Sequence, residues 1–120
     1  MRERHWVALA AGFGFVAVAF GAVAAHGFDA AGDERAARLV ETGSRYQLLH
    51  AVAMLAAVAW VRERPPAVAW WAVGTLLFPC SLYALALGAP PAVATLAPVG
   101  GGALLLGWAA LAWHALKGVR

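Results

Sequence analysis

The sequence predicts an all-α integral membrane protein: a four-helix transmembrane bundle with a short amphipathic helix between the first and second spans. The first observation behind this prediction is composition. Of the 120 residues, 63% are hydrophobic and 12% are charged, against about 45–50% and about 25% in soluble domains. Nine basic and six acidic residues could not form the polar surface that a soluble domain of this length leaves exposed. Composition therefore argues against a soluble enzyme, and the high hydrophobic fraction also excludes a disordered chain.

The second observation is the spacing of the charges, which defines four spans. Residues 6–25 form an uncharged run of 20 residues, enough to cross a hydrocarbon core of about 30 Å at about 1.5 Å per residue. Residues 46–61 form a run of 16, and residues 67–116 form one of 50 that the tight-turn sequence Gly88-Ala89-Pro90-Pro91 interrupts. We predict one domain, residues 1–120, with spans at about 6–26, 45–61, 67–87 and 94–116.

The segment between the first two spans predicts the amphipathic helix, at about residues 33–43. Asp33 is a suitable N-cap residue. Glu34 with Arg38, and Glu41 with Arg45, are four residues apart in the favourable acid-first order. The helix either bends at Gly43 or continues straight into the second span.

The distribution of basic residues predicts the orientation. With four spans both termini lie on one side, which carries six of the nine basic residues, and the positive-inside rule places that side in the cytoplasm. The six are Arg2, Arg4, Arg62, Arg64, Lys117 and Arg120, and the other three are Arg35, Arg38 and Arg45. The tryptophans fit the same map, because Trp6, Trp60, Trp70, Trp71, Trp108 and Trp113 all fall toward the predicted cytoplasmic ends of their spans. Basic residues that flank apolar runs and form no stripe do not indicate nucleic-acid binding.

The first span has an alternative interpretation as a cleaved signal peptide. Arg2 and Arg4 resemble a basic n-region, and Ala22-Val23-Ala24 resembles a small-residue cleavage site. We expect the span to be retained, because it carries a face of small residues suited to helix packing. That face contains Gly14, Ala17, Gly21 and Ala24, and the fourth span repeats the spacing with Gly100, Ala103, Gly107 and Ala110.

Polar residues within the apolar runs are the candidate functional residues, because they cost free energy in lipid and usually face protein or water. Under the four-span map they lie in the outer half of the membrane, opposite the tryptophans. Tyr46, Gln47 and His50 are expected to share one face of the second span, because the first two lie four and three residues before His50. The candidate cluster contains His26, Glu41, Arg45, Tyr46, Gln47, His50, Ser81 and Tyr83. Purely structural interpretations stay open for both histidines: His26 caps its helix at the interface, and His50 belongs to a structural hydrogen-bond network.

Several segments together resemble a known family. They are residues 21–27 (GAVAAHG), 41–51 (ETGSRYQLLHA), 81–83 (SLY) and 98–101 (PVGG). In this order they resemble the YgdD-like family of small bacterial inner-membrane proteins, a domain-of-unknown-function family with eukaryotic transmembrane relatives. The resemblance covers nearly the whole chain, and residues 41–51 are its most specific part. It implies four spans in the inner membrane and brings no established activity.

Three functional hypotheses follow. The first is a non-enzymatic bundle that binds a lipid, a membrane-protein partner or further copies of itself through the outer-half cluster. The second is an oligomeric transport or proton-relay protein with His26, Tyr46, Gln47 and His50 along a hydrated path. The third is copper or haem binding through His26, His50, Met54 and Cys80. We expect no enzyme, since Ser81 has no identifiable acid–base partner and the spans hold no paired carboxylates. The single cysteine, Cys80, excludes an intramolecular disulfide and a multi-cysteine zinc site, and no cofactor is predicted beyond the third hypothesis.

Overall fold

The computed structural model describes residues 2–61 and 66–118, and every regular element in these two ranges is helical. Four long helices run antiparallel to their neighbours along the chain: α1 (Glu3–Val23), α2 (Glu34–Trp60), α3 (Ala67–Ala86) and α4 (Leu96–Leu116). Two short elements join them at one end, the π-helical turn η1 (Ala24–Phe28) and the 3₁₀ turn η2 (Pro91–Thr95). The prediction of an all-α membrane bundle is confirmed.

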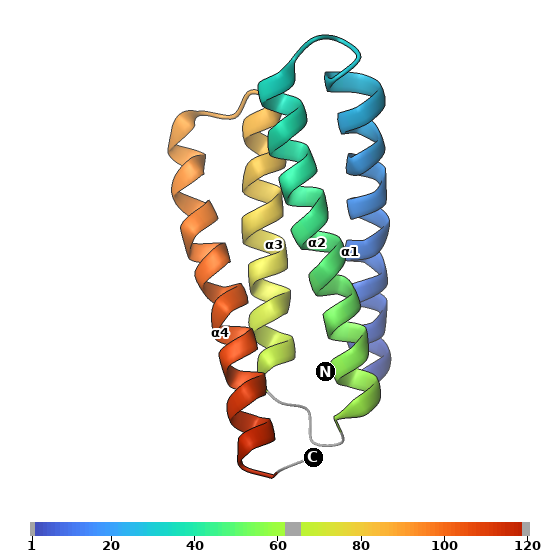
Figure 1. Cartoon of the computed structure of the whole chain (residues 1–120), viewed down its shortest axis with the longest axis vertical. Coiled ribbons are helices and arrows are strands. Elements are labelled where there is room, and N and C mark those ends of the chain that lie inside the picture. The colour runs from blue at the N-terminus through green and yellow to red at the C-terminus, as the bar shows by residue number, and fades with distance from the viewer. Residues whose placement is uncertain (1, 62–65, 119–120) are drawn as a thin grey trace.

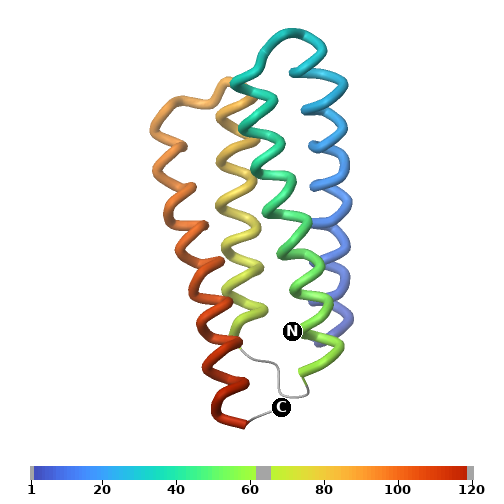
Figure 2. The backbone as a smooth tube through the Cα atoms, viewed as in Figure 1, coloured from blue at the N-terminus to red at the C-terminus, as the bar shows by residue number. Residues whose placement is uncertain are grey.

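The four helices follow one another in space in the order of the sequence (Figure 1). α2 and α3 lie in the middle, α1 flanks α2, and α4 flanks α3 (Figures 1 and 2). We call the end that carries η1 and η2 the loop end. The opposite end, where α1 begins and α4 finishes, is the terminal end. The molecule is about twice as long as it is wide, at 50 × 25 × 21 Å.

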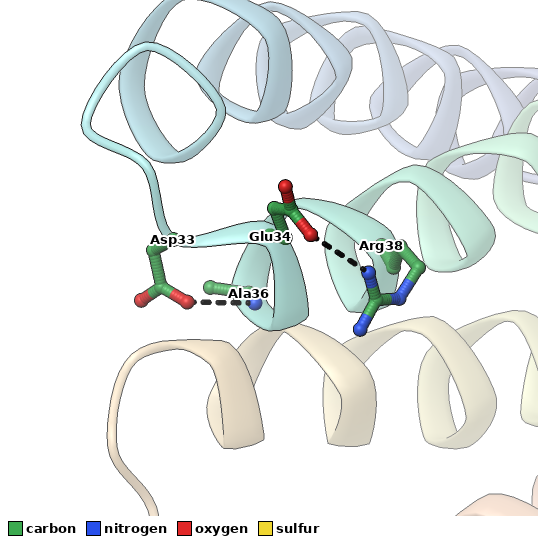
Figure 3. Close-up of polar contacts among 4 residues, drawn as sticks. All are labelled: Asp33, Glu34, Ala36 and Arg38. Atoms are coloured by element: carbon green, nitrogen blue, oxygen red, sulfur yellow. Dashed lines mark hydrogen bonds and ion pairs between the residues drawn. The ribbon is translucent and has the colours of Figure 1, made fainter.

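α2 is one continuous helix of 27 residues, so the predicted amphipathic segment is its first three turns and not a separate element. Of the two predicted alternatives at Gly43, the straight continuation is the one observed. The N-cap prediction is confirmed, because the Asp33 side chain accepts a hydrogen bond of 3.1 Å from the backbone N–H of Ala36 (Figure 3). One turn further on, Glu34 and Arg38 form an exposed ion pair at 3.8 Å, also drawn in Figure 3.

Close backbone contact joins α3 to both of its neighbours. Gly43 of α2 lies against the backbone carbonyl of Pro79, where a Cβ would stand 3.3 Å from that oxygen. Pro79 lies inside α3, a position that membrane helices tolerate because neighbouring helices pack around it. On the other side, a Cβ on Gly74 would stand 2.8 Å from the carbonyl oxygen of Gly100 in α4. Glycines at these positions let the helices approach through their backbones.

The apolar interior has a larger part toward the terminal end and a smaller part toward the loop end. Met54, Val68 and Trp71 are among the residues that fill the larger part. The smaller part forms around Ala24, Val40 and Tyr83. Trp71 is 1% exposed, so its indole packs between the helices and does not face lipid, although it lies near the start of α3 at the terminal end.

Three helical segments are long and apolar enough to cross a membrane within the described ranges. They are Glu3–Phe28 (α1 with η1), Ala67–Ala86 (α3) and Pro91–Leu116 (η2 with α4). α2 does not qualify on composition, because its first half carries five charged residues and its second half contains Gln47 and His50. Gln47 and His50 are buried against the neighbouring helices, whereas the charged residues are exposed.

Candidate functional site: a groove between α2 and α4

The eight predicted polar residues do not form a single cluster. Gln47 and Tyr83 meet inside the bundle, whereas Tyr46 and His50 face α4. Tyr46 and Gln47 are consecutive residues and therefore about 100° apart around the helix axis, so the one polar face predicted for them is two faces. The remaining residues lie elsewhere: Ser81 bonds locally, and His26, Glu41 and Arg45 are exposed.

The interior contact joins α2 to α3 beneath α1. The Tyr83 hydroxyl donates a 2.7 Å hydrogen bond to Oε1 of Gln47, which is 1% exposed. The Tyr83 ring stacks on Phe20 of α1 with centroids 3.9 Å apart and planes within 3°. The other edge of that ring lies over Gly43, where a Cβ would stand 2.8 Å from Cε1. Three helices therefore fix this tyrosine, and its arrangement is that of a structural contact.

His50 forms the second polar contact, and it bridges α2 to α4. Its Nδ1 lies 2.7 Å from the Tyr46 carbonyl oxygen, and the Trp108 indole N–H donates to its Nε2 at 3.0 Å. Since the indole can only donate and the carbonyl can only accept, His50 is the neutral tautomer with its proton on Nδ1. Both ring nitrogens are thus engaged, so a metal ion at Nε2 would have to displace Trp108.

A groove runs along this side of the bundle between α2 and α4, with α3 as its floor. The part toward the loop end has a volume of about 460 Å³, within the roughly 300–1,000 Å³ usual for ligand sites. It is lined by Tyr46, His50, Phe78, Pro98, Gly101, Gly102, Leu104, Leu105 and Trp108. A smaller hollow of about 250 Å³ continues beyond the indole of Trp108 toward the terminal end, between Ala53, Trp60, Trp71 and Leu111. The Trp108–His50 bridge separates the two.

The groove opens sideways, toward the surface that lipid covers in a membrane bundle. Leu105 is 71% exposed, Trp108 is 47% exposed and Tyr46 is 42% exposed. Gly101 and Gly102 keep the α4 wall low, because neither carries a side chain and nothing lies within 4 Å of a Cβ built on Gly102. This side of the bundle therefore combines an apolar hollow with two aromatic polar groups, the Tyr46 phenol and the Trp108 indole.

The other predicted ligands do not assemble around His50. The Ser81 hydroxyl donates to the Phe78 carbonyl at 2.7 Å, one turn earlier in its own helix. Met54 is fully buried in the apolar core, and Cys80 and His26 are exposed. Within residues 2–61 and 66–118, no group of three or more His, Cys, Asp or Glu side chains is arranged to hold a metal ion.

The predicted helix-packing residues occupy both flanking interfaces. A Cβ on Gly100 would strike the backbone of Phe78, and one on Gly107 would strike the Trp71 ring. Ala103 lies buried on the same α4 face. On α1, Ala17 is fully buried, and its carbonyl accepts a 2.7 Å hydrogen bond from Ser44.

Of the two glycines predicted to pack α1, Gly21 lies at a close contact with α2 and Gly14 does not. A Cβ on Gly21 would stand 3.1 Å from the Ser44 Oγ, whereas a Cβ on Gly14 would meet nothing within 4 Å.

Sequence reasoning missed several residues that build these contacts, above all Trp108, Phe78 and Ser44. Trp108 was interpreted only as an interfacial tryptophan. A search for donors to the intramembrane histidine could have raised it as a candidate, since an indole N–H can only donate. Ser44 lies next to the charged Arg45 and within the motif segment, and its spacing from Ala17 gives no signal in the sequence.

Comparison with known proteins places the chain in a family. Residues 20–101 match the family model described as "Protein of unknown function (DUF423)". This chain belongs to the DUF423 family. Residues 20–101 of this DUF423 chain contain the Gln47–Tyr83 pair and His50, whereas Trp108 and most of α4, from residue 102 onward, lie beyond them.

Relatives extend the similarity over almost the full length. A protein of Haemophilus influenzae named "UPF0382 membrane protein" is 39% identical over 119 residues, with 96% of both chains covered. The "UPF0382 inner membrane protein YgdD" of Escherichia coli K12 and its counterpart in Shigella flexneri are each 34% identical over 122 residues, covering 98% of this chain and 93% of theirs. No solved structure matches. The resemblance inferred from the motif segments is confirmed, and these DUF423 relatives bring no named activity.

Proposed function

We propose that this DUF423 protein is a non-enzymatic bundle of the bacterial inner membrane that binds a membrane lipid in the groove between α2 and α4. The location is supported by the names of its Escherichia coli and Shigella relatives. The groove supports the lipid, because it is apolar, opens sideways and offers a phenol and an indole along its length. The sequence analysis left open a lipid, a membrane-protein partner or further copies of the chain, and the apolar, laterally open groove favours a lipid.

Four spans with cytoplasmic termini complete the proposal. α2 lies antiparallel between α1 and α3 along the length of the bundle (Figure 1), so residues 45–61 cross the membrane together with their neighbours. All five charged residues of α2 precede residue 46 and occupy the outer interface. Arg2, Arg4 and Lys117 lie at the terminal end, whereas Arg62, Arg64 and Arg120, which the charge count also used, fall outside the described residues.

Reporter fusions test the orientation. A green fluorescent protein joined after Arg120 is expected to fluoresce, and alkaline phosphatase inserted after Gly32 is expected to be active, because only the latter site reaches the periplasm. Inactive phosphatase at Gly32 with active phosphatase at the C-terminus would overturn the orientation. A third reporter, joined to the N-terminus, is expected to report the same side as the one after Arg120. If these two reporters lay on opposite sides of the membrane, the four-span map would be wrong.

Lipid binding is tested by native mass spectrometry of protein released from membranes in a mild detergent. Gly102→Leu places a side chain in the groove that Gly102 lines, and its Cβ meets nothing within 4 Å. Gly12→Leu is the matched control, because Gly12 is equally free of neighbours but lies on α1. We expect a retained phospholipid adduct in the unmodified protein and in the Gly12 variant, and its loss in the Gly102 variant.

Two outcomes would overturn the proposal that a lipid binds in the groove. Equal adducts in all three proteins would mean that the lipid is not held in the groove. A protein subunit that co-purifies in place of lipid, and that the Gly102 variant alone loses, would assign the groove to a membrane-protein partner or a second copy of the chain.

A further inference from the structure

A further hollow lies on the loop-end side of Phe78, which contacts the Tyr46 ring edge to face with centroids 5.2 Å apart. This hollow of about 260 Å³ is lined by Arg35, Arg38, Leu39, Thr42, Phe78 and Leu82. Phe78 lines both this hollow and the larger one, so the two adjoin. The apolar groove therefore has a cationic end.

One face of α2 forms the wall along the whole of this path. Arg35, Arg38, Thr42, Tyr46 and His50 follow one another at steps of three or four residues, which places them in one row on a helix. The row changes in character with depth: two guanidinium groups come first, then a hydroxyl and a phenol, then the histidine that closes the groove with Trp108.

The length of the row matches one leaflet of a bilayer. Twelve residues separate Arg38 from His50, a rise of about 18 Å at about 1.5 Å per residue. Half of a bilayer with its headgroups measures about 20–22 Å. A lipid whose headgroup lies beside the arginines would therefore reach the Trp108–His50 bridge with its acyl chain.

Charge decides the headgroup class. None of the six residues that line the hollow is acidic. Arg38 is paired with Glu34 at 3.8 Å, but both side chains are exposed, and such surface pairs are weak. Arginine forms stronger, bidentate hydrogen bonds with phosphate oxygens, so an anionic phosphate group competes well for Arg38 and adds Arg35.

We propose that the groove selects an anionic phospholipid, with its phosphate headgroup on Arg35 and Arg38 and an acyl chain between α2 and α4. This proposal rests on the lipid binding proposed above and names the class of lipid. It also assigns a binding role to Arg35 and Arg38, which the sequence analysis used only to predict the orientation and the charge pairs of the helix.

The test is competition between two lipids in nanodiscs that contain equal amounts of phosphatidylglycerol and phosphatidylcholine, followed by native mass spectrometry of the released protein. The double variant Arg35→Gln with Arg38→Gln removes both positive charges that line the hollow at the loop end. Arg2→Gln with Arg4→Gln makes the same change in net charge at the terminal end, and Arg35→Lys with Arg38→Lys keeps the charge but removes the planar donor fork.

We expect the unmodified protein to retain phosphatidylglycerol at least about fivefold over phosphatidylcholine. The loop-end glutamine variant is expected to hold both lipids equally, the lysine variant to keep part of the preference, and the terminal-end variant to keep all of it. No preference in the unmodified protein, or a preference that survives loss of Arg35 and Arg38, would overturn the anionic class. Loss of both lipids in Gly102→Leu would still support the groove, whereas absence of any adduct in the unmodified protein would overturn both proposals.

Discussion

Replacing Gly100 by alanine tests the backbone packing of α3 against α4. A Cβ at this position would stand 2.9 Å from both the Phe78 Cα and the Leu77 Cβ, and closer still to the Phe78 backbone nitrogen. Ordinary carbon contacts lie at about 3.5–4.0 Å, so the helices would have to separate by about 0.6–1.1 Å. Backbone atoms cannot rotate away as a side chain can. We therefore expect the overpacking to destabilise the bundle by about 1–3 kcal/mol.

Gly102→Ala is the matched control, two residues further along the same helix. Both substitutions remove the same backbone freedom, worth about 1 kcal/mol in favour of alanine in a helix, but a Cβ on Gly102 meets nothing within 4 Å. The difference between the two free energies of unfolding therefore isolates the interface. It is measured by circular dichroism of the purified protein in mixed micelles during titration with sodium dodecyl sulfate. Equal stability of the two variants would refute the close approach of α3 and α4.

Three further substitutions test the polar contacts. Tyr83→Phe removes the hydroxyl that bonds Gln47 and is expected to lower the free energy of unfolding by about 0.6–1.7 kcal/mol; a double-mutant cycle with Gln47→Leu should return a coupling of that size, and no coupling would show that the bond does not form. Trp108→Phe keeps an aromatic ring but leaves Nε2 of His50 without its donor, so the His50 proton signals in the nuclear magnetic resonance spectrum should shift, whereas unchanged signals would contradict the bridge. Ser44→Ala removes the bond from α2 to α1 and should destabilise the bundle by about 1 kcal/mol, against no loss if Ser44 faces lipid.

The sequence was sufficient for the elements that depend on composition and local chemistry. Long uncharged runs predicted the helices, because a chain in lipid must satisfy its backbone hydrogen bonds within each segment. Asp33 predicted the start of α2, since a cap depends only on the next three residues. The motif segments predicted the family.

The candidate site depended on packing that the sequence does not encode locally. Tyr46 and Gln47 were assigned to one face, yet Gln47 is bonded to Tyr83 inside the bundle, whereas Tyr46 lines the groove with its ring against Phe78. That division follows from where α3 and α4 stand around α2, which no spacing within α2 reveals. Trp108 lies 58 residues from His50 in the sequence, so its role as a donor became visible only in the folded chain. For the same reason the sequence did not reveal that the Trp71 ring is buried between the helices.

The arrangement of the helices explains why a groove exists at all. α4 packs on α3 through glycines and meets α2 through the Trp108–His50 bridge. α4 packs closely against α3 and lies beside one face of α2. Gly101 and Gly102 leave the space between α2 and α4 open, where larger side chains would fill it. The same property of α4, its glycine content, thus produces both the tight interface and the open groove.

Photo-crosslinking of the acyl chain tests the central claim most directly. A phosphatidylglycerol that carries a diazirine near the middle of one acyl chain is incorporated into membranes with the protein, irradiated, and mapped by mass spectrometry of the peptides. Labels are expected on the groove walls near Phe78 and Leu105, with few on Phe15, which is at least as exposed and lines a separate apolar hollow between α1 and α2. Equal labelling of Phe15 and Leu105 would mean that the groove receives only bulk lipid, and the proposed binding site would be wrong.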